Sequence, residues 1–221
     1  MSELVSRVRP AAILFDMDGL LIDSERIALA SLAVASAHLG IDFPSHVAQR
    51  LIGLGRDGGS AVIRGALGES FPLAEFWHAW SQDYLRRVEE GVPAKVEVAA
   101  TLEYVAAKNV PMAVATSTET PWAKKKLLKA GIHHFFDHVV GRDAVPHGKP
   151  APDLYLEAAA RLKTKTSDCW AFEDSLPGLT AAVASGARAH WIPDVAMIES
   201  QQLPSGVERV ESIAAIREWI R

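Results

Sequence analysis

The stretch AAILFDMDG, residues 11–19, decides the fold of this chain. Its first five residues are apolar and do not alternate with polar ones, which is typical of a parallel strand buried on both faces. Ligands of open α/β sheets bind just beyond the carboxyl ends of such strands, so we expect Asp16 to lie at a reaction site. If the chain stays extended through Met17, Asp16 and Asp18 project to the same side.

Two carboxylates this close repel each other, and without a cation the pKa of one of them would rise. The pair therefore indicates a divalent-metal site, an acid/base role, or both. The alternative is a strand that ends in an ordinary Asp-Gly turn, in which Asp16 and Asp18 only accept hydrogen bonds from nearby amide groups.

Two further apolar runs end in polar residues that suit the same chemistry. Thr116-Ser117-Thr118 follows the second run, Glu173-Asp174-Ser175 follows the third, and Gly148-Lys149-Pro150 lies between them and leads into a helix. The carboxyl ends of parallel strands share one edge of a sheet, so hydroxyls, carboxylates and a lysine would meet near Asp16. Together these groups predict a phosphate site that includes a metal ion.

Four motifs in this chain resemble those of the haloacid dehalogenase superfamily, and more narrowly its β-phosphoglucomutase-like branch of phosphatases and phosphomutases. In chain order they are Asp16-x-Asp18-Gly19-x-x-x-Asp23-Ser24-Glu25, Thr116 after an apolar strand, Lys149-Pro150-Ala151-Pro152-Asp153, and Glu173-Asp174-Ser175-x-x-Gly178. The resemblance implies an α/β fold: a doubly wound, Rossmann-like parallel sheet with an inserted all-helical cap domain. We expect a catalytic core of residues 1–21 and 93–221 and a cap of residues 22–92.

The resemblance also implies the residues of an active site that uses Mg²⁺. Asp16 would attack phosphorus to give an aspartyl-phosphate, and Asp18 would act as general acid and then as general base. To act as an acid Asp18 must be protonated, so we expect neighbouring negative charge to raise its pKa above the usual ~3.9. The implied catalytic residues are Asp16, Asp18, Thr116 and Lys149; the metal ligands are Asp16, the Asp18 carbonyl, Asp174 and, directly or through water, Glu173; the phosphate- or substrate-binding residues are Gly19, Thr116, Ser117, Lys149 and Arg56.

Each of these residues also has an ordinary structural interpretation. Thr116 could end a strand or cap a helix, Lys149 could be a solvated loop lysine, and Glu173 and Asp174 could cap the next helix. The motifs in this order favour the functional interpretation: a Mg²⁺-dependent phosphatase of small phosphorylated metabolites, such as sugar or nucleoside monophosphates.

The main alternative is a phosphomutase of the β-phosphoglucomutase type, and a lesser one is a non-catalytic protein that binds phosphorylated metabolites. Mutase relatives carry a histidine in the first cap helix where this chain has Ala28, which favours simple hydrolysis. Dehalogenase relatives lack the second aspartate, which is present here as Asp18.

Several other features have simpler interpretations. Residues 53–58 have the glycine spacing of a dinucleotide fingerprint but follow a helix, so we interpret them as the cap's specificity loop, with Arg56 facing substrate or solvent. The run Lys124-Lys125-Lys126 is typical of a solvated helix face. We expect Trp77 and Trp80 to pack within the cap, and Cys169 to be a buried, unreactive thiol.

Composition is that of an ordinary globular protein. The 221 residues carry a net charge of −4, which gives no general attraction for nucleic acid or acidic membranes. We expect a cytoplasmic monomer that binds a small phosphate ester, without nucleic acid or membrane as partner. The patterns predict strands at 110–115, 138–140, 169–172 and 189–192, and helices at about 24–39, 44–52, 60–67, 73–87 and 213–220.

Overall fold

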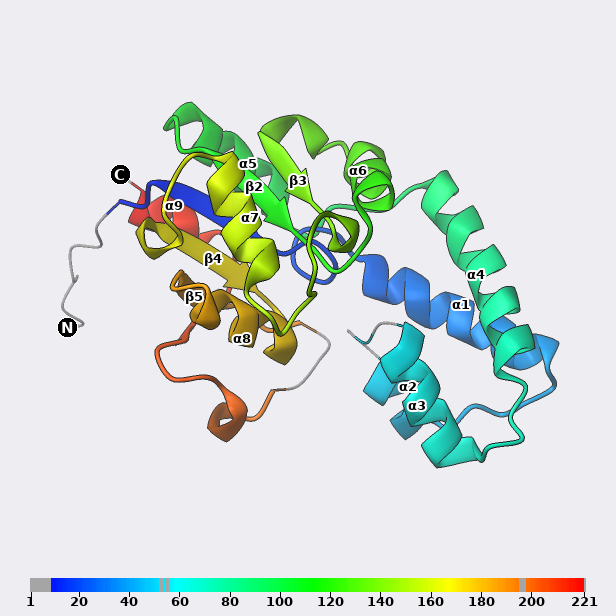
Figure 1. Ribbon diagram of the computed structural model, residues 1–221. Helices are drawn as coiled ribbons and strands as arrows, with labels where there is room; N and C mark the ends of the chain where they lie inside the picture. Colours follow the sequence, from blue (N-terminus) through cyan, green and yellow to red (C-terminus); the bar gives the residue numbers. More distant parts are fainter. Residues whose placement is uncertain (1–8, 52–53, 55, 195–197, 221) are drawn as a thin grey trace.

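The computed structural model describes residues 9–51, 54, 56–194 and 198–220. Figure 1 shows a sheet flanked by helices and, to one side of it, a separate group of helices. The sheet has six parallel strands in the order β3-β2-β1-β4-β5-β6. They are β1 (Ala12–Phe15), β2 (Met112–Ala115), β3 (His138–Val140), β4 (Cys169–Glu173), β5 (Arg188–Trp191) and β6 (Glu208–Arg209).

Strand β1 lies in the middle of the sheet because its side chains are apolar on both faces. All four of its residues are fully buried. Ile13 and Phe15 belong to one hydrophobic cluster, and Ala12 and Leu14 belong to another on the opposite face. The prediction of a parallel strand covered on both sides is therefore confirmed.

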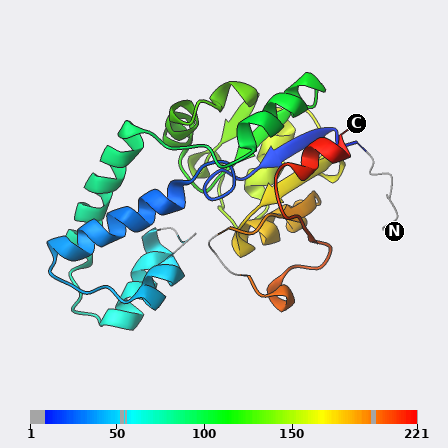
Figure 2. The same cartoon turned by 180° about the vertical axis from the view of Figure 1, so that it is seen from behind.

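Helices cover the two faces of the sheet. The face of Ile13 and Phe15 packs against α5 (Val98–Ala107), α6 (Thr120–Lys129) and α9 (Ala215–Trp219). The face of Ala12 and Leu14 packs against α7 (Asp153–Arg161) and α8 (Leu176–Ala184). Helices α7 and α8 are in front in Figure 1, whereas α5 and α9 are in front in Figure 2. This arrangement is the doubly wound α/β fold that we predicted.

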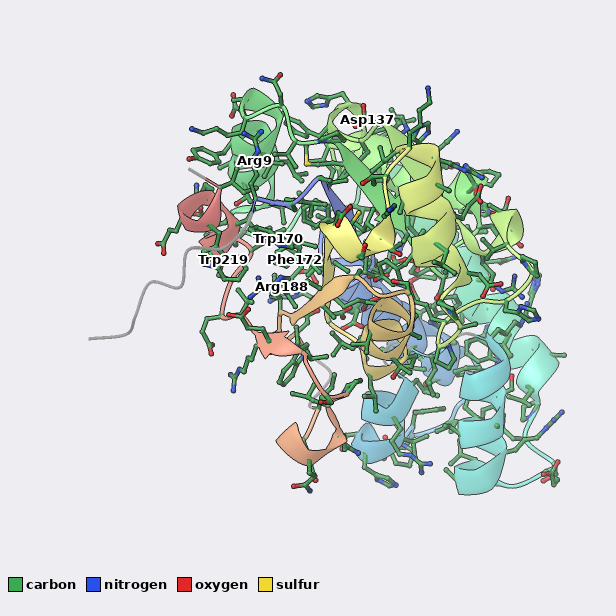
Figure 3. All side chains as sticks on the ribbon, turned by 60° about the vertical axis from the view of Figure 1, so that its left-hand side comes forward. Arg9, Asp137, Trp170, Phe172, Arg188 and Trp219 are labelled. Carbon is green, nitrogen blue, oxygen red and sulfur yellow. The ribbon has the colours of Figure 1, made fainter. Side chains whose placement is uncertain are left out.

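Aromatic side chains attach the last helix to the sheet. Trp170 and Phe172 are two residues apart on β4 and so project to the same face, where Trp219 of α9 lies beside them (Figure 3). The ring centroid of Trp219 is 5.7 Å from that of Trp170 and 6.3 Å from that of Phe172. Contacts of this kind stabilise the end of the chain through burial and ring packing.

A helical module leaves the sheet after β1 and returns before α5. It consists of α1 (Ser24–His38), α2 (Ser45–Leu51), α3 (Arg56–Leu67) and α4 (Leu73–Glu90). Its own apolar cluster includes Leu32, Ile63 and Phe76. The two connections lie side by side, since Ile22 forms a bridge with Ala94. The module fits the predicted cap, while the limits 22–92 stay a prediction.

Helix α3 begins earlier than we predicted. The glycine-rich stretch suggested a loop up to residue 59, but Arg56 already starts the helix. Gly59 is buried, and a Cβ added there would lie 3.1 Å from the Trp77 ring of α4. Close packing between the two helices thus overrides the low helix propensity of glycine. Gly53 and Gly55, which formed part of the proposed loop, lie outside the described residues.

Other elements differ from prediction only slightly, apart from one strand. The short strand β6 (Glu208–Arg209) was missed because it is polar and carries no periodic pattern.

Cys169 is buried, and burial raises the pKa of its thiol to about 11, as expected for an unreactive cysteine. None of the helices in the described ranges combines the length and the apolar character that a bilayer crossing needs.

Candidate active site

The carboxyl ends of β1 and β4 bring three carboxylates together. Asp16 directly follows β1, and its main-chain N–H donates to the carbonyl of Phe172 in β4, at 3.0 Å. Glu173 ends β4 and Asp174 follows it. One oxygen from each of Asp16, Glu173 and Asp174 lies within 4.8 Å of the others. The structure thus brings these predicted metal ligands into one buried cluster.

Lys149 enters this cluster from the loop before α7. Its side chain is only 4% exposed, and its Nζ donates to the carboxylates of Asp16 and of Glu173, the latter at 2.5 Å. Burial by itself would lower the pKa of Lys149, but the charges of the two carboxylates outweigh it and raise the pKa. The alternative of a solvated loop lysine is therefore wrong.

Glu173 is held by donors on both of its oxygens. Oε1 accepts from Lys149 and from the hydroxyl of Tyr155, at 2.7 Å, and Oε2 accepts from the hydroxyl of Ser175, at 3.0 Å. A Cβ at Gly178 would lie 1.8 Å from Oε1, so only glycine leaves room for this carboxylate. We infer that Glu173 chiefly fixes Lys149. Tyr155 was missed because no local pattern distinguishes it from a core tyrosine.

The donor set of the cluster fits a hard cation. Burial, together with the charges of Glu173 and Asp18, raises the pKa of Asp16 to about 8, although Lys149 opposes this shift. Burial and neighbouring carboxylates also raise the pKa of Asp174 well above its ordinary value. Among the described residues none donates a hydrogen bond to the Asp174 carboxylate, which is therefore available to a metal. Oxygen ligands with excess negative charge are those that Mg²⁺ and Ca²⁺ prefer.

Asp18 has a different environment from Asp16. Its carboxylate accepts from Ser24 Oγ at 2.6 Å, Thr118 Oγ1 at 2.7 Å and Lys126 Nζ at 2.9 Å. Burial would raise its pKa, but the charge of Lys126 and these hydrogen bonds lower it overall. Our expectation of a raised Asp18 pKa is therefore wrong for this structure, because a lysine rather than a further carboxylate is its nearest charged neighbour.

Lys126 lies at the site, so our prediction of a solvated face is wrong for this lysine. Its side chain is 7% exposed, and its Nζ lies 5.3 Å from the ring centre of Tyr84 in α4. Lys124 of the same run is exposed, as predicted. Ala123, Lys126 and Leu127 share one helix face and are all buried, so helical periodicity could have identified the lysine.

A second group of carboxylates adjoins the first. Glu25, Asp174 and Asp194 place oxygens within 4.8 Å of one another. Burial, followed by the charge of Asp194, raises the pKa of Glu25 to about 7. Lys95 pairs with Asp194 and also donates to the carbonyl of Gly19, at 2.7 Å. Gly19 has φ +86°, and a Cβ there would lie 2.3 Å from Asp174, so this glycine permits the close approach of the two segments.

A cavity of about 310 Å³ connects this site with the helical module. Of the predicted site residues, its lining includes Asp16, Asp18, Thr116, Ser117, Lys149, Asp174 and Arg56, but not Gly19 or Glu173. The hydroxyl oxygen of Thr116 accepts from the Thr118 main-chain N–H at 3.1 Å. Within the described part of the chain nothing accepts a hydrogen bond from this hydroxyl, so it can donate to a ligand. The guanidinium of Arg56 lies 5.8 Å from the Trp77 ring centre, on the module side of the cavity.

A sequence model described as haloacid dehalogenase-like hydrolase matches residues 10–186. The chain belongs to the haloacid dehalogenase-like hydrolases. Among similar proteins, the phosphorylated carbohydrates phosphatase of Thermotoga maritima is 30% identical over 175 residues, which cover 79% of this chain and 81% of that protein. The β-phosphoglucomutase of Bacillus subtilis is 27% identical over 182 residues, which cover 79% of this chain and 80% of that protein.

A solved haloacid dehalogenase family hydrolase from Deinococcus radiodurans, with bound phosphate and sodium, has a TM-score of 0.77. It is 27% identical to this chain, and the match covers 95% of this chain and 96% of the other. The resemblance to the β-phosphoglucomutase-like branch is thus confirmed, and the chain is a hydrolase of the phosphatase type.

Replacing Gly178 tests whether Glu173 is fixed in place. In Gly178→Ala the new methyl group overlaps the Glu173 carboxylate, which Lys149 and Tyr155 prevent from moving, so we expect a loss of about 1–3 kcal/mol in unfolding free energy. Gly65→Ala is the control, because a Cβ at Gly65 of α3 meets nothing within 4 Å; it should stabilise by up to ~1 kcal/mol. Chemical denaturation measures the unfolding free energy of both variants. Equal changes in Gly178→Ala and Gly65→Ala would contradict a clash between the new methyl group and Glu173.

Replacing Lys126 tests whether it positions Asp18. Lys126→Met keeps the apolar stem but removes the ammonium donor, so Asp18 keeps the hydrogen bonds from Ser24 and Thr118 but loses its charged partner and is held less firmly. We expect phosphatase kcat to fall about tenfold or more, because small misplacements of a reacting group are costly. Lys124→Met, at an exposed position of α6, should stay within about twofold of wild type. Equal activities of the two variants would show that Lys126 has no such role.

Proposed function

We propose that the protein is a Mg²⁺-dependent phosphatase that hydrolyses small phosphorylated metabolites, such as sugar or nucleoside monophosphates, through an aspartyl-phosphate on Asp16. The observation that carries the proposal is the set of groups around Asp16: a buried carboxylate, in contact with Lys149 and close to Asp174, at the edge of a cavity large enough for a metabolite. A nucleophile, a cationic partner and a cation site are what phosphoryl transfer requires.

In the first half of the reaction an oxygen of Asp16 attacks phosphorus and the bond between phosphorus and the ester oxygen breaks. Asp18 gives its proton to the departing alcohol. A phosphate dianion bound beside Asp18 adds negative charge there and favours the protonated carboxyl. Lys149 and the hydroxyl of Thr116 bind the phosphoryl oxygens, where negative charge accumulates.

In the second half a water molecule attacks phosphorus of the aspartyl-phosphate, Asp18 removes a proton from that water, and Asp16 is released as a carboxylate. The hydrogen bonds from Ser24, Thr118 and Lys126 keep Asp18 in place for both proton transfers. The same group thus serves as acid and then as base.

The carboxylates of Asp16 and Asp174 and the main-chain carbonyl of Asp18 would hold the Mg²⁺ ion, with Glu173 as a further candidate. When bound, Mg²⁺ supplies positive charge that offsets the repulsion between these carboxylates and the incoming phosphate. The name of the Thermotoga maritima relative supports a phosphorylated carbohydrate as substrate. We also propose a monomer that works in the cytoplasm.

Removing divalent metal tests the cation site directly. Excess chelator should abolish release of inorganic phosphate, and added Mg²⁺ should restore it, because the negative charge around Asp16 needs a balancing cation. Ca²⁺ should inhibit, since its larger and looser ligand shell misplaces the reacting oxygens. Full activity in chelator would rule out a metal ion at Asp16 and Asp174.

A comparison of products separates hydrolysis from the phosphomutase alternative, which the Bacillus subtilis relative keeps open. Ala28 lines the cavity, and its methyl group can neither donate nor accept a hydrogen bond, so nothing at this position restrains Asp18 from activating water. With β-glucose 1-phosphate, with and without the 1,6-bisphosphate, we expect inorganic phosphate to be the main product. Glucose 6-phosphate formed much faster than phosphate would favour the mutase.

A further inference from the structure

Most of the residues that the helical module contributes to the cavity lining are apolar. They include Leu29, Leu51, Leu54, Trp77 and Trp80. The opposite side carries the carboxylates, hydroxyls and lysines of the reaction site. A bound phosphate ester therefore has its charged end near Asp16 and its alcohol against an apolar surface.

The two tryptophans of this surface use their indole N–H groups elsewhere. Nε1 of Trp77 donates to Ser60 Oγ at 2.9 Å, and Nε1 of Trp80 donates to the main-chain oxygen of Ala28 at 3.0 Å. Indole offers only this one donor and no acceptor. Trp77 and Trp80 can therefore contribute ring surface to a ligand but no conventional hydrogen bond.

The aromatic side chains are held in a fixed arrangement. The Trp80 ring stacks on Tyr84 with centroids 4.6 Å apart, and it meets Trp77 edge to face at 5.6 Å. A surface whose rings are already packed loses little conformational freedom when a ligand binds. Flat rings of a ligand pack well on such side chains.

Polar partners for a sugar are few on this side of the cavity. Ser24 donates to Asp18, and Glu25 lies against Asp194, so both are engaged at the reaction site. Tyr84 lies beside Lys126. Among the described module residues that line the cavity, Arg56 and Ser81 are the remaining polar side chains. Hydroxyls of a bare sugar that lose water without gaining a partner weaken binding.

We propose that the preferred substrate is a phosphorylated sugar that carries an aromatic ring, and that this ring binds against Trp80, Leu29 and Leu54. The inference rests on the proposed phosphatase function and specifies its substrate class. Ring burial at this surface raises kcat/KM, because the apolar contacts form without leaving polar groups unpaired.

Two esters that differ only in the ring test this preference: phenyl β-D-ribofuranoside 5-phosphate and methyl β-D-ribofuranoside 5-phosphate. Both release a primary sugar hydroxyl, so the chemical step is the same. We expect kcat/KM, measured from released phosphate, to be at least about tenfold higher for the phenyl riboside. An equal or lower value overturns the ring preference. If the protein hydrolyses none of the three esters, that is, neither riboside nor a chromogenic phosphate ester, the proposed phosphatase function itself is overturned.

A matched pair of variants tests where the ring binds. Leu54 and Leu156 are similarly exposed, at 42% and 46%, but only Leu54 lines the cavity, whereas Leu156 lies on α7. Leu54→Gln should reduce the phenyl-to-methyl ratio of kcat/KM about threefold or more, because a polar group replaces part of the apolar surface. Leu156→Gln should leave the ratio unchanged. An unchanged ratio in Leu54→Gln overturns the assignment of the ring to this surface.

Discussion

The repulsion among three buried carboxylates at the ends of β1 and β4 is the constraint on which the site depends. Asp16, Glu173 and Asp174 lie too close together to be charged at the same time without positive charge beside them. Lys149 supplies one such charge, and the cation that we propose supplies the rest. Gly178 matters for the same reason, since it gives Glu173 the room to hold Lys149. A phosphate ester then approaches a site in which positive charge is already in place.

Asp18, which we propose as the acid/base group, is linked to the helical module as well as to the carboxylate cluster. Asp18 accepts hydrogen bonds from Ser24, which begins α1, and from Lys126, which packs on Tyr84 of α4. A shift of the module relative to the sheet would therefore change the surroundings of Asp18. Under our proposal the module contributes the apolar surface for the alcohol and, through Ser24 and the Tyr84 ring beside Lys126, part of the surroundings of Asp18.

Much of the fold could be predicted because its signals are local. Asp16 and Thr116 directly follow β1 and β2, and Glu173 ends β4. The apolar runs before these residues are typical of buried parallel strands. Helical periodicity predicts that Lys126 is buried, but neither its pairing with Asp18 nor the contact of Tyr155 with Glu173 follows from the sequence, because both depend on which side chains the packed elements bring together. The early start of α3 likewise results from contact between Gly59 and Trp77, which no pattern within the segment expresses.

The central claim is that Asp16 becomes phosphorylated. The most direct measurement is acid quenching during turnover of a ³²P-labelled ester, followed by identification of the labelled peptide. Label should appear on Asp16 in the wild type, and Asp16→Asn should carry none while kcat falls by about a thousandfold or more and the fold is kept. Asp42→Asn, at an exposed aspartate of the helical module, should behave like wild type. Turnover without label on Asp16, or a tenth of the wild-type activity remaining in Asp16→Asn, would contradict the account.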